Sequence, residues 1–308
     1  MKAVVYRTYG GPEVLEYTDV PDPKLGPDSV LVRVKAASVN PVDWKIQAGY
    51  LDGAMDAVFP VIPGWDVAGV VERPGAAVTE FRPGEEVIGY VREDMVGRGT
   101  FAEYIAAPVR TLARKPANLT FEQAAGMPLA GLTAYQALVK HLSVRPEEVV
   151  LVHAAAGGVG SAAVQVARAL GARVIGTASE RNHDYLRSLG AEPVTYGEGL
   201  VGRVRALAPD GVDAVLDLIG GEALAVSPGL LAPGGRLASI ADGSVLGLGG
   251  HYVFVRPDAQ DLAALTELAE KGRFTVEIAA TFPLEQAADA QRLNQDGHTR
   301  GKVIVTVP

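Results

Sequence analysis

The sequence predicts an α/β protein with two domains, one β-rich and one built on a doubly wound parallel sheet. Strand patterns separated by glycine and proline turns dominate roughly the first 117 residues. From about Thr120 onward, strands and helices alternate, as they do where crossover helices connect parallel strands. The segment 149–170 combines a buried strand, a glycine turn and an amphipathic helix. These three observations predict two domains of different architecture in one chain.

The bulk composition excludes several classes of protein. A chain of 308 residues can form two domains with a large core. The net charge of −8 argues against a nucleic-acid partner, and no apolar run approaches the ~18 residues that cross a membrane. The short apolar start resembles a first strand rather than a signal peptide, so we expect a cytoplasmic protein. The chain has no cysteine, which excludes thiolate metal ligands, and no metal-ligand spacing occurs among the histidines His141, His153, His183, His251 and His298.

The β-rich domain is expected to include both ends of the chain. Val30, Val32 and Val34 alternate with other residues in a half-buried strand over 29–36. Further strands are expected at 67–72, 86–91 and 100–107. The tail contains a strand, a helix over 284–293 and a final strand over 302–307, and we expect it to rejoin the first domain. The predicted division is therefore residues 1–119 with 277–308 in one domain, and 120–276 in the other.

The second domain shows regular alternation. Thr120 is a predicted helix N-cap with Gln123 three residues later, before helices over 121–126 and 131–141. Strands are expected at 149–153, 173–177, 192–195, 214–217, 235–240 and 252–255. Helices are expected at 158–170, 183–189, 199–207, 221–230 and 259–271.

The glycine turn has the spacing of a dinucleotide-binding fingerprint, Ala155-x-Gly157-x-x-Gly160, with alanine replacing the first glycine. Gly157 would let a pyrophosphate approach the backbone, and Gly160 would let the helix pack close to the strand. The helix N-terminus would offer free N–H groups to the phosphates. We therefore expect a cofactor to bind the run Ala156, Gly157, Gly158, Val159 and Gly160; the alternative is a glycine-rich turn of another doubly wound fold.

The residues after the second strand favour NADPH over NADH. The position where an acidic residue binds the ribose of NAD falls at Thr177–Ala178, and neither residue is acidic. Ser179 and Arg181 follow, and both can bind a 2′-phosphate. Glu180 opposes this interpretation, because it could bind the ribose of NADH if the loop turned differently. Arg181 could also be an ordinary surface charge.

Further motifs occur in order along nearly the whole chain: Pro12-Glu13-Val14-Leu15, Ala37-Ser38-Val39-Asn40-Pro41-Val42-Asp43, Pro63-Gly64-Trp65-Asp66, Phe101-Ala102-Glu103-Tyr104, Gly131-Leu132-Thr133-Ala134-Tyr135, Leu231-Ala232-Pro233-Gly234-Gly235-Arg236 and Gly301-Lys302-Val303. With them the sequence resembles the medium-chain dehydrogenase/reductase superfamily, in its zinc-free quinone oxidoreductase (zeta-crystallin-like) branch. The resemblance implies a GroES-like catalytic domain and a Rossmann cofactor domain. In the zinc-dependent branch the block at Gly64-Trp65-Asp66 is Gly-His-Glu, with the histidine on zinc, so zinc chemistry is disfavoured here.

The resemblance also implies site residues. Trp65 would form an aromatic pocket floor, and Asn40, Lys45 and Tyr50 would be donors to the substrate oxygen; Asn40 could instead be a turn residue and Lys45 a surface lysine. Asp43 lies in the same loop, where its carboxylate could simply hold the backbone. Thr133 and Tyr196 would contact the cofactor, although the Thr133 hydroxyl could bond back to its own helix. Ile240 and Ala241 follow a strand and should line the nicotinamide, and the apolar strand over 252–255 suits edge pairing in a homodimer.

The expected activity is NADPH-dependent, zinc-independent reduction of quinones or α,β-unsaturated carbonyl compounds by hydride from nicotinamide C4. A second candidate is an enoyl-thioester reductase acting on CoA or carrier-bound chains, ranked lower because little positive charge besides Arg92 and Arg98 gathers near the expected entrance. A third is a non-catalytic NADPH-binding sensor or structural protein. Hydride transfer to any quinone or enone would count against the third.

Overall fold

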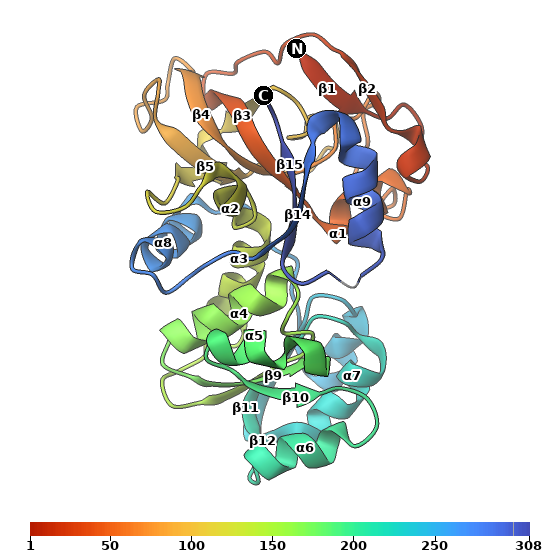
Figure 1. Cartoon of the computed structure of the whole chain (residues 1–308), viewed down its shortest axis with the longest axis vertical. Helices are drawn as coiled ribbons and strands as arrows, with labels where there is room; N and C mark the ends of the chain where they lie inside the picture. The colour runs from red at the N-terminus through yellow and green to blue at the C-terminus, as the bar shows by residue number, and fades with distance from the viewer. Residues whose placement is uncertain (298) are drawn as a thin grey trace. The chain divides into compact units, whose positions relative to one another are not determined.

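The computed structural model describes residues 1–297 and 299–308, so His298 lies outside the described residues. The chain divides into two compact units (Figure 1). Unit 1 comprises Met1–Leu129, Arg256–Lys271 and Thr275–Pro308, and unit 2 comprises Ala130–Val255 and Gly272–Phe274.

The units differ from the expected division in where two helices fall, α2 (Phe121–Ala125) and α8 (Ala259–Glu270), which both belong to unit 1. The reason is side-chain bonding to the β-rich part. The Thr266 hydroxyl of α8 donates to the Arg114 carbonyl at 3.1 Å, and the Asn118 amide donates to the Ala269 carbonyl at 2.7 Å. The expected capping box of α2 is confirmed, since Thr120 Oγ1 accepts from the Gln123 N–H and Gln123 Oε1 from the Thr120 N–H.

Unit 1 is organised around a seven-stranded sheet with the order β14-β15-β3-β4-β5-β7, and β6 pairs with β3 outside this path. The strands of this sheet are β3 Ser29–Val39, β4 Asp66–Pro74, β5 Glu86–Tyr90, β6 Tyr104–Pro108, β7 Leu112–Arg114, β14 Ile278–Pro283 and β15 Lys302–Thr306. A separate two-stranded sheet of unit 1 consists of β1 Lys2–Val5 and β2 Glu16–Asp19. Besides α2 and α8 the helices of unit 1 are α1 Pro41–Gln47 and α9 Ala287–Gln295. Alternating valines of β3 are fully buried, so the period-2 pattern defines one core face. From the tail of the chain, β15 pairs antiparallel with β3.

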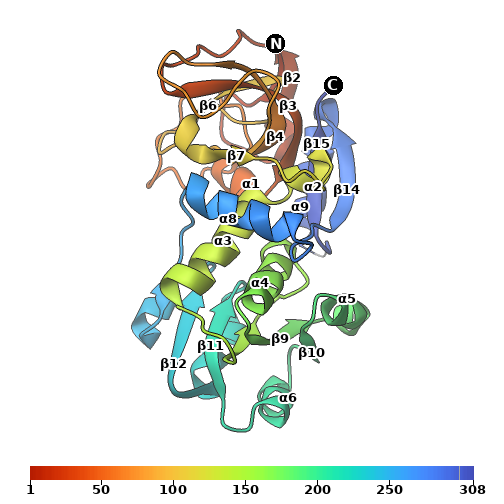
Figure 2. The ribbon, with the colours of Figure 1, turned by 90° about the vertical axis from the view of Figure 1, so that its left-hand side faces the viewer.

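Unit 2 contains an entirely parallel six-stranded sheet with the order β10-β9-β8-β11-β12-β13. The strands are β8 Val149–Val152, β9 Arg173–Ala178, β10 Glu192–Thr195, β11 Val212–Asp217, β12 Leu231–Ser239 and β13 His251–Tyr252. Its helices are α4 Gly158–Ala169, α5 His183–Ser188, α6 Leu200–Leu207 and α7 Gly221–Val226, of which α4, α5 and α6 flank the sheet (Figure 2). Strand order reverses between β8 and β11, which is where doubly wound sheets bind ligands beyond the carboxyl ends of their strands.

Several expected elements differ in their bounds, and three of them show the largest changes. The strand expected at 100–107 begins only at Tyr104, and the strand expected at 252–255 is reduced to the two residues of β13. The helix expected at 131–141 is α3 Pro128–Tyr135, which continues as a π-helix over Gln136–His141. Within the described residues, no helix is long and apolar enough to span a membrane.

Candidate active site

The fingerprint turn of unit 2 lies between β8 and α4. Gly157 is the residue before the helix, and a Cβ added to it would meet only the Ala154 carbonyl oxygen, at 3.5 Å. A Cβ on Gly160 would lie 2.3 Å from the same oxygen, so Gly160 is required for close packing of turn and helix. The first turn of α4 directs its N–H groups beyond the helix end. The open backbone at Gly157 therefore fits a dinucleotide pyrophosphate.

A buried polar chain under this turn was missed by the sequence reasoning. The Ser227 hydroxyl donates its proton to the Ala223 carbonyl at 2.7 Å. Its oxygen therefore accepts from His153 Nε2 at 3.1 Å, and the imidazole proton lies on Nε2. Nδ1 then faces Thr177 Oγ1 at 3.5 Å, and that oxygen accepts from the Ala154 N–H. Burial lowers the pKa of His153, and the negative charge of Asp217 opposes part of this change. A neutral His153 thus supports the turn from below.

A second buried group shapes the carboxyl ends of β11 and β12. The Asp217 carboxylate accepts from the Ser239 hydroxyl at 2.6 Å and from the Gly220 N–H at 3.0 Å. Ser239 Oγ in turn accepts from the N–H groups of Ala241 and Asp242, each at 3.1 Å. Ile240 and Ala241, which are expected to line the nicotinamide, are therefore held at the strand ends of unit 2. Thr133 lies in the same unit, buried in α3.

The residues expected to discriminate between the cofactors gather at the ends of two neighbouring strands. Register pairs Ala178 of β9 with Thr195 of β10, so Ser179 and Tyr196 follow adjacent strand ends. Ser179 Oγ accepts from Asn182 Nδ2 at 3.3 Å, which leaves its proton for another acceptor. Arg181 is exposed, and so is Tyr196, at 60%. Glu180 is exposed between Ser179 and Arg181.

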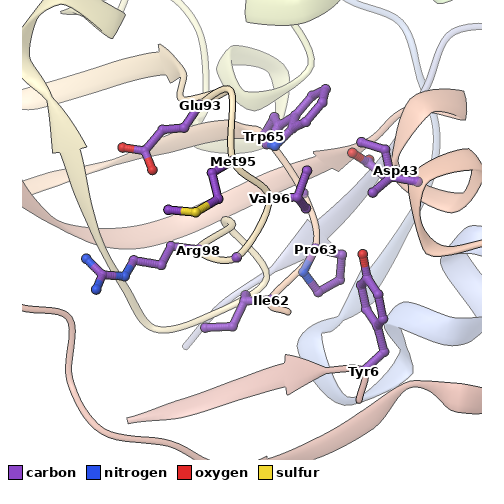
Figure 3. Close-up of a pocket in the computed structure, with 12 residues that line it drawn as sticks. Tyr6, Asp43, Ile62, Pro63, Trp65, Glu93, Met95, Val96 and Arg98 are labelled. Atoms are coloured by element: carbon purple, nitrogen blue, oxygen red, sulfur yellow. The ribbon is translucent and has the colours of Figure 1, made fainter. Parts of the chain in front are cut away.

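Unit 1 contains a pocket of about 320 Å³, counting space open to solvent (Figure 3). It is lined by Tyr6, Asp43, Ile46, Ile62, Pro63, Gly64, Trp65, Glu93, Met95, Val96, Gly97 and Arg98. Trp65 is 5% exposed and packs edge-on to Tyr90, with ring centroids 6.0 Å apart. Gly64 has φ +89°, and a Cβ there would lie 2.6 Å from Phe101 and Thr100 atoms, so glycine is needed beside the tryptophan. Trp65 therefore lines this pocket with an aromatic side chain, and its expected role as the floor of the substrate pocket stays a prediction.

A buried charge network lies behind this pocket. The Asp66 carboxylate accepts from the Ser38 hydroxyl at 2.6 Å, from Asn40 Nδ2 at 2.8 Å and from the Leu129 N–H at 2.7 Å. Lys302 Nζ lies 3.9 Å from it and also donates to Asn40 Oδ1. Burial raises the pKa of Asp66, while Lys302 and the hydrogen bonds lower it. Burial lowers the pKa of Lys302, while the carboxyl groups of Asp66 and Asp43 raise it. Asp66 and Lys302 thus form a buried ion pair, and neighbouring groups hydrogen-bond to both of its members.

Three of the expected substrate donors do not line this pocket. Both sides of the Asn40 amide are engaged with Asp66 and Lys302, so this residue organises the network instead of offering a free donor. Lys45 is exposed, with Nζ 5.6 Å from the centre of the Trp44 ring, and Tyr50 is 74% exposed. The periodicity of α1 keeps Lys45 out of the pocket lining, because Asp43 and Ile46 occupy the buried face of that helix. Asp43, treated only as a possible loop support, is the polar residue of α1 that reaches the pocket.

The described residues contain no cluster of three or more histidine, aspartate or glutamate side chains arranged to hold a metal. Residue 65, where the zinc-dependent branch carries histidine, is a tryptophan with no lone pair for a metal. A zinc-independent reaction stays a prediction.

Together, a sheet with a dinucleotide turn and a β-rich unit with a pocket define a nucleotide-dependent oxidoreductase. Residues 26–117 match the family model for the alcohol dehydrogenase GroES-like domain, and residues 189–305 match the model for zinc-binding dehydrogenase. The chain belongs to the medium-chain dehydrogenase/reductase superfamily, with quinone oxidoreductases and alkenal/one reductases among its relatives, and it is an oxidoreductase. The expected GroES-like and Rossmann fold class is confirmed.

Two curated relatives span the chain. A chloroplastic NADPH-dependent alkenal/one oxidoreductase of Arabidopsis thaliana is 36% identical, over 99% of this chain and 79% of its own. The chloroplastic quinone-oxidoreductase QR1 of Triphysaria versicolor is 32% identical, over 99% and 98%. The cytoplasmic location expected for this chain stays a prediction.

Three solved structures share the whole fold. An NAD-dependent alcohol dehydrogenase is 35% identical with a TM-score of 0.90, covering 100% of both chains. A quinone oxidoreductase from Coxiella burnetii is 34% identical with a TM-score of 0.87, covering 100% of this chain and 99% of that one. A mycobacterial protein in complex with NADPH is 30% identical with a TM-score of 0.86, covering 99% and 100%. The cofactors named for these structures differ, so the choice for this chain depends on its own residues.

Proposed function

We propose that this protein reduces quinones or α,β-unsaturated carbonyl compounds with NADPH. The observation that carries the proposal is the pocket of unit 1, whose wall is aromatic and apolar at Trp65, Tyr6, Ile62 and Met95. Such a wall suits a flat conjugated substrate. A bound nicotinamide would supply hydride, while the chain binds and orients the acceptor. Relatives named for quinone and alkenal/one reduction support the same substrate class.

The preference for NADPH rests on the end of β9. This strand ends at Ala178 without an acidic residue, which removes the usual partner of the ribose hydroxyls of NAD. Ser179 has a hydroxyl proton available, and the exposed Arg181 follows two positions later. A guanidinium and a hydroxyl are suitable ligands for a 2′-phosphate. The exposed Glu180 is the one residue here that would favour NADH.

The direct test measures binding before turnover. Fluorescence titrations with NADPH and NADH come first, followed by oxidation of the bound cofactor with separate panels of quinones, enones and enoyl-CoA. Tighter binding of NADPH and its consumption by quinones or enones support the proposal. Consumption only by enoyl-CoA favours the enoyl-thioester alternative, and tight binding without turnover on any panel favours a non-catalytic role.

Removing the expected 2′-phosphate ligands should change cofactor preference. In the double variant Ser179→Ala, Arg181→Ala the Kd for NADPH should rise more than about tenfold, since charge-assisted hydrogen bonds contribute roughly 1.5–3 kcal/mol each. The Kd for NADH should change little. Glu180→Gln is the matched control: it should leave NADH binding unchanged, and weaker NADH binding in that variant would assign Glu180 to the ribose and overturn the NADPH preference.

We also propose that the protein is a homodimer through the β13 edge of unit 2. β13 is the last strand of its sheet, and exposed apolar side chains surround it: Leu246 at 64%, Leu248 at 46%, Tyr252 at 40% and Phe254 at 49%. An uncovered sheet edge beside apolar side chains favours pairing with a second copy. Sedimentation velocity should give twice the chain mass for the wild type and the chain mass for Tyr252→Glu. A monomeric wild type at micromolar concentration would refute the proposal.

A further inference from the structure

Two carboxyl groups line the pocket of unit 1: Glu93 is exposed, and Asp43 is buried. Asp43 lines the pocket from α1 and is 4% exposed (Figure 3). Its Oδ2 accepts from the Asn40 N–H at 2.7 Å, and within the described residues its carboxyl makes no other hydrogen bond. The second oxygen is therefore available to the pocket.

The surrounding charges determine which carboxyl keeps a proton. The Asp66 carboxylate accepts from three hydrogen-bond donors and lies 3.9 Å from the Lys302 ammonium, and these contacts oppose the burial that raises the pKa of Asp66. Asp43 has a single backbone donor, so its charge is poorly compensated in the same buried region. Burial and the nearby Asp66 raise the pKa of Asp43 to about 7, against the lowering effects of the Asn40 N–H and Lys302. A carboxyl group that titrates near neutral pH can serve as an acid in a reaction.

In the part of the chain that the structure describes, Lys302 is the cation that lowers the pKa of Asp43, whereas Arg98 lines the pocket as an exposed side chain. The titratable and charged groups on the elements around it are Lys45 of α1, Asp66 of β4, Tyr90 of β5, Lys302 of β15, Tyr6 after β1, Glu93 and Arg98 of the pocket loop, and Asp289 and Arg292 of α9. Asp289 and Arg292 pair with each other at 2.6 Å, and Lys45 is exposed beside Trp44. Figure 3 shows Asp43 and Tyr6 at the right of the pocket, with the hydroxyl end of Tyr6 directed toward Asp43.

We propose that Asp43 is the proton donor of this pocket. The inference rests on the proposed reductase activity. When hydride adds to the β-carbon of an enone, the carbon–carbon π electrons move to form an enolate. The proton on the Asp43 carboxyl then passes to the α-carbon, which leaves a carboxylate that solvent reprotonates. For a quinone the same proton passes to the reduced oxygen. The reaction consumes one hydride and one proton and needs no further reactant.

The variant Asp43→Asn tests this step, because an amide oxygen can still accept from the Asn40 N–H while the acidic proton is lost. With NADPH and 2-methyl-2-cyclohexenone, the wild-type kcat should fall tenfold per pH unit above about 7, where Asp43 loses its proton. In Asp43→Asn, kcat at pH 6 should fall at least about tenfold, and this limb of the pH profile should disappear. Asp94→Asn, at an exposed loop carboxyl outside the pocket, is the control and should match the wild type.

Product stereochemistry separates proton donation from a structural role. In deuterated water the wild type should deliver deuterium to one face of the α-carbon, whereas in Asp43→Asn delivery from solvent should reduce that selectivity. Equal selectivity and an unchanged pH profile in Asp43→Asn, with an active wild type, overturn the proposal and leave the reductase function intact. A wild type that reduces neither quinones nor enones overturns both.

Folding provides a readout independent of cofactor and substrate. An aspartate has a pKa near 4 when unfolded, so a folded pKa of about 7 means that Asp43 stabilises the fold below pH 4 and that this contribution is lost as pH rises to about 7. Only the wild type loses this contribution, so the urea midpoint of Asp43→Asn minus that of the wild type should increase from pH 4 to pH 7. Above pH 7 this difference should stay constant. A difference that does not vary with pH contradicts a protonated Asp43.

Discussion

Replacing Gly157 by alanine is expected to raise the Kd for NADPH at least about tenfold, about 1.4 kcal/mol, while leaving the fold intact. The added Cβ meets no protein atom closer than the Ala154 carbonyl oxygen at 3.5 Å, and the φ of −75° suits alanine. The space that the Cβ would fill is the space through which a pyrophosphate approaches the backbone. Fluorescence titration with NADPH gives the Kd, and thermal unfolding without cofactor should give a Tm close to that of the wild type.

Gly160→Ala is the matched control, because it makes the same chemical change three residues later with the opposite expected outcome. Its Cβ would lie 2.3 Å from the Ala154 oxygen and 2.6 Å from Ala155 Cα, so the turn and helix must separate. We expect a loss of roughly 1–3 kcal/mol in unfolding free energy, as for other overpacked sites. If Gly157→Ala instead lowers stability and leaves NADPH affinity unchanged, the assignment of this turn to the cofactor is wrong.

Lys302→Met is expected to reduce the free energy of unfolding at pH 7 by about 3–5 kcal/mol. Lys302 is 6% exposed, and it lies beside Asp66 at 3.9 Å and donates to Asn40. Without the ammonium, Asp66 must stay buried without its countercharge or take up a proton. The deficit should therefore shrink as pH falls from 7 toward 4, because the folded variant binds a proton that the unfolded chain has released. Urea unfolding at several pH values measures this trend.

The control for this variant is Lys271→Met, at the residue that follows α8. Lys271 pairs with Glu267 at 3.2 Å, but both side chains are more than 60% exposed, at 63% and 68%. An exposed pair of this kind contributes little, so the change in stability should stay within about 0.5 kcal/mol and vary little with pH. Equal losses in the two variants would mean that burial gives Lys302 no special role.

Periodic features could be predicted from sequence because they repeat within one element. The alternation of valines in β3, the capping box at Thr120 and the turn at Gly157–Gly160 each occupy a few consecutive residues with defined spacing. The presence of Trp65 in the pocket lining could be predicted because the motif Gly64-Trp65-Asp66 corresponds to Gly-His-Glu in the zinc-dependent branch. The parallel direction of the strands in unit 2 followed from the alternation of strands and helices.

The polar network behind the pocket could not be predicted, since its members are distant in sequence. Asp66 and Lys302 are joined only when β15, from the end of the chain, pairs with β3. Asn40 was assigned to the substrate because nothing local indicated that both sides of its amide would be occupied. The face of α1 was the one available signal: Asp43 and Ile46 share helical spacing that excludes Lys45.

The pocket wall has a chemical consequence for the lifetime of the protein. Quinones and enones are electrophiles that alkylate thiolates, the most nucleophilic side chains at neutral pH. The pocket is formed by aromatic, aliphatic, carboxyl, guanidinium and thioether groups, and the whole chain contains no cysteine. If this protein reduces quinones or enones as proposed, it has no thiol for them to alkylate. Prolonged turnover without thiol protectants in the buffer should then cause no loss of activity through thiol modification.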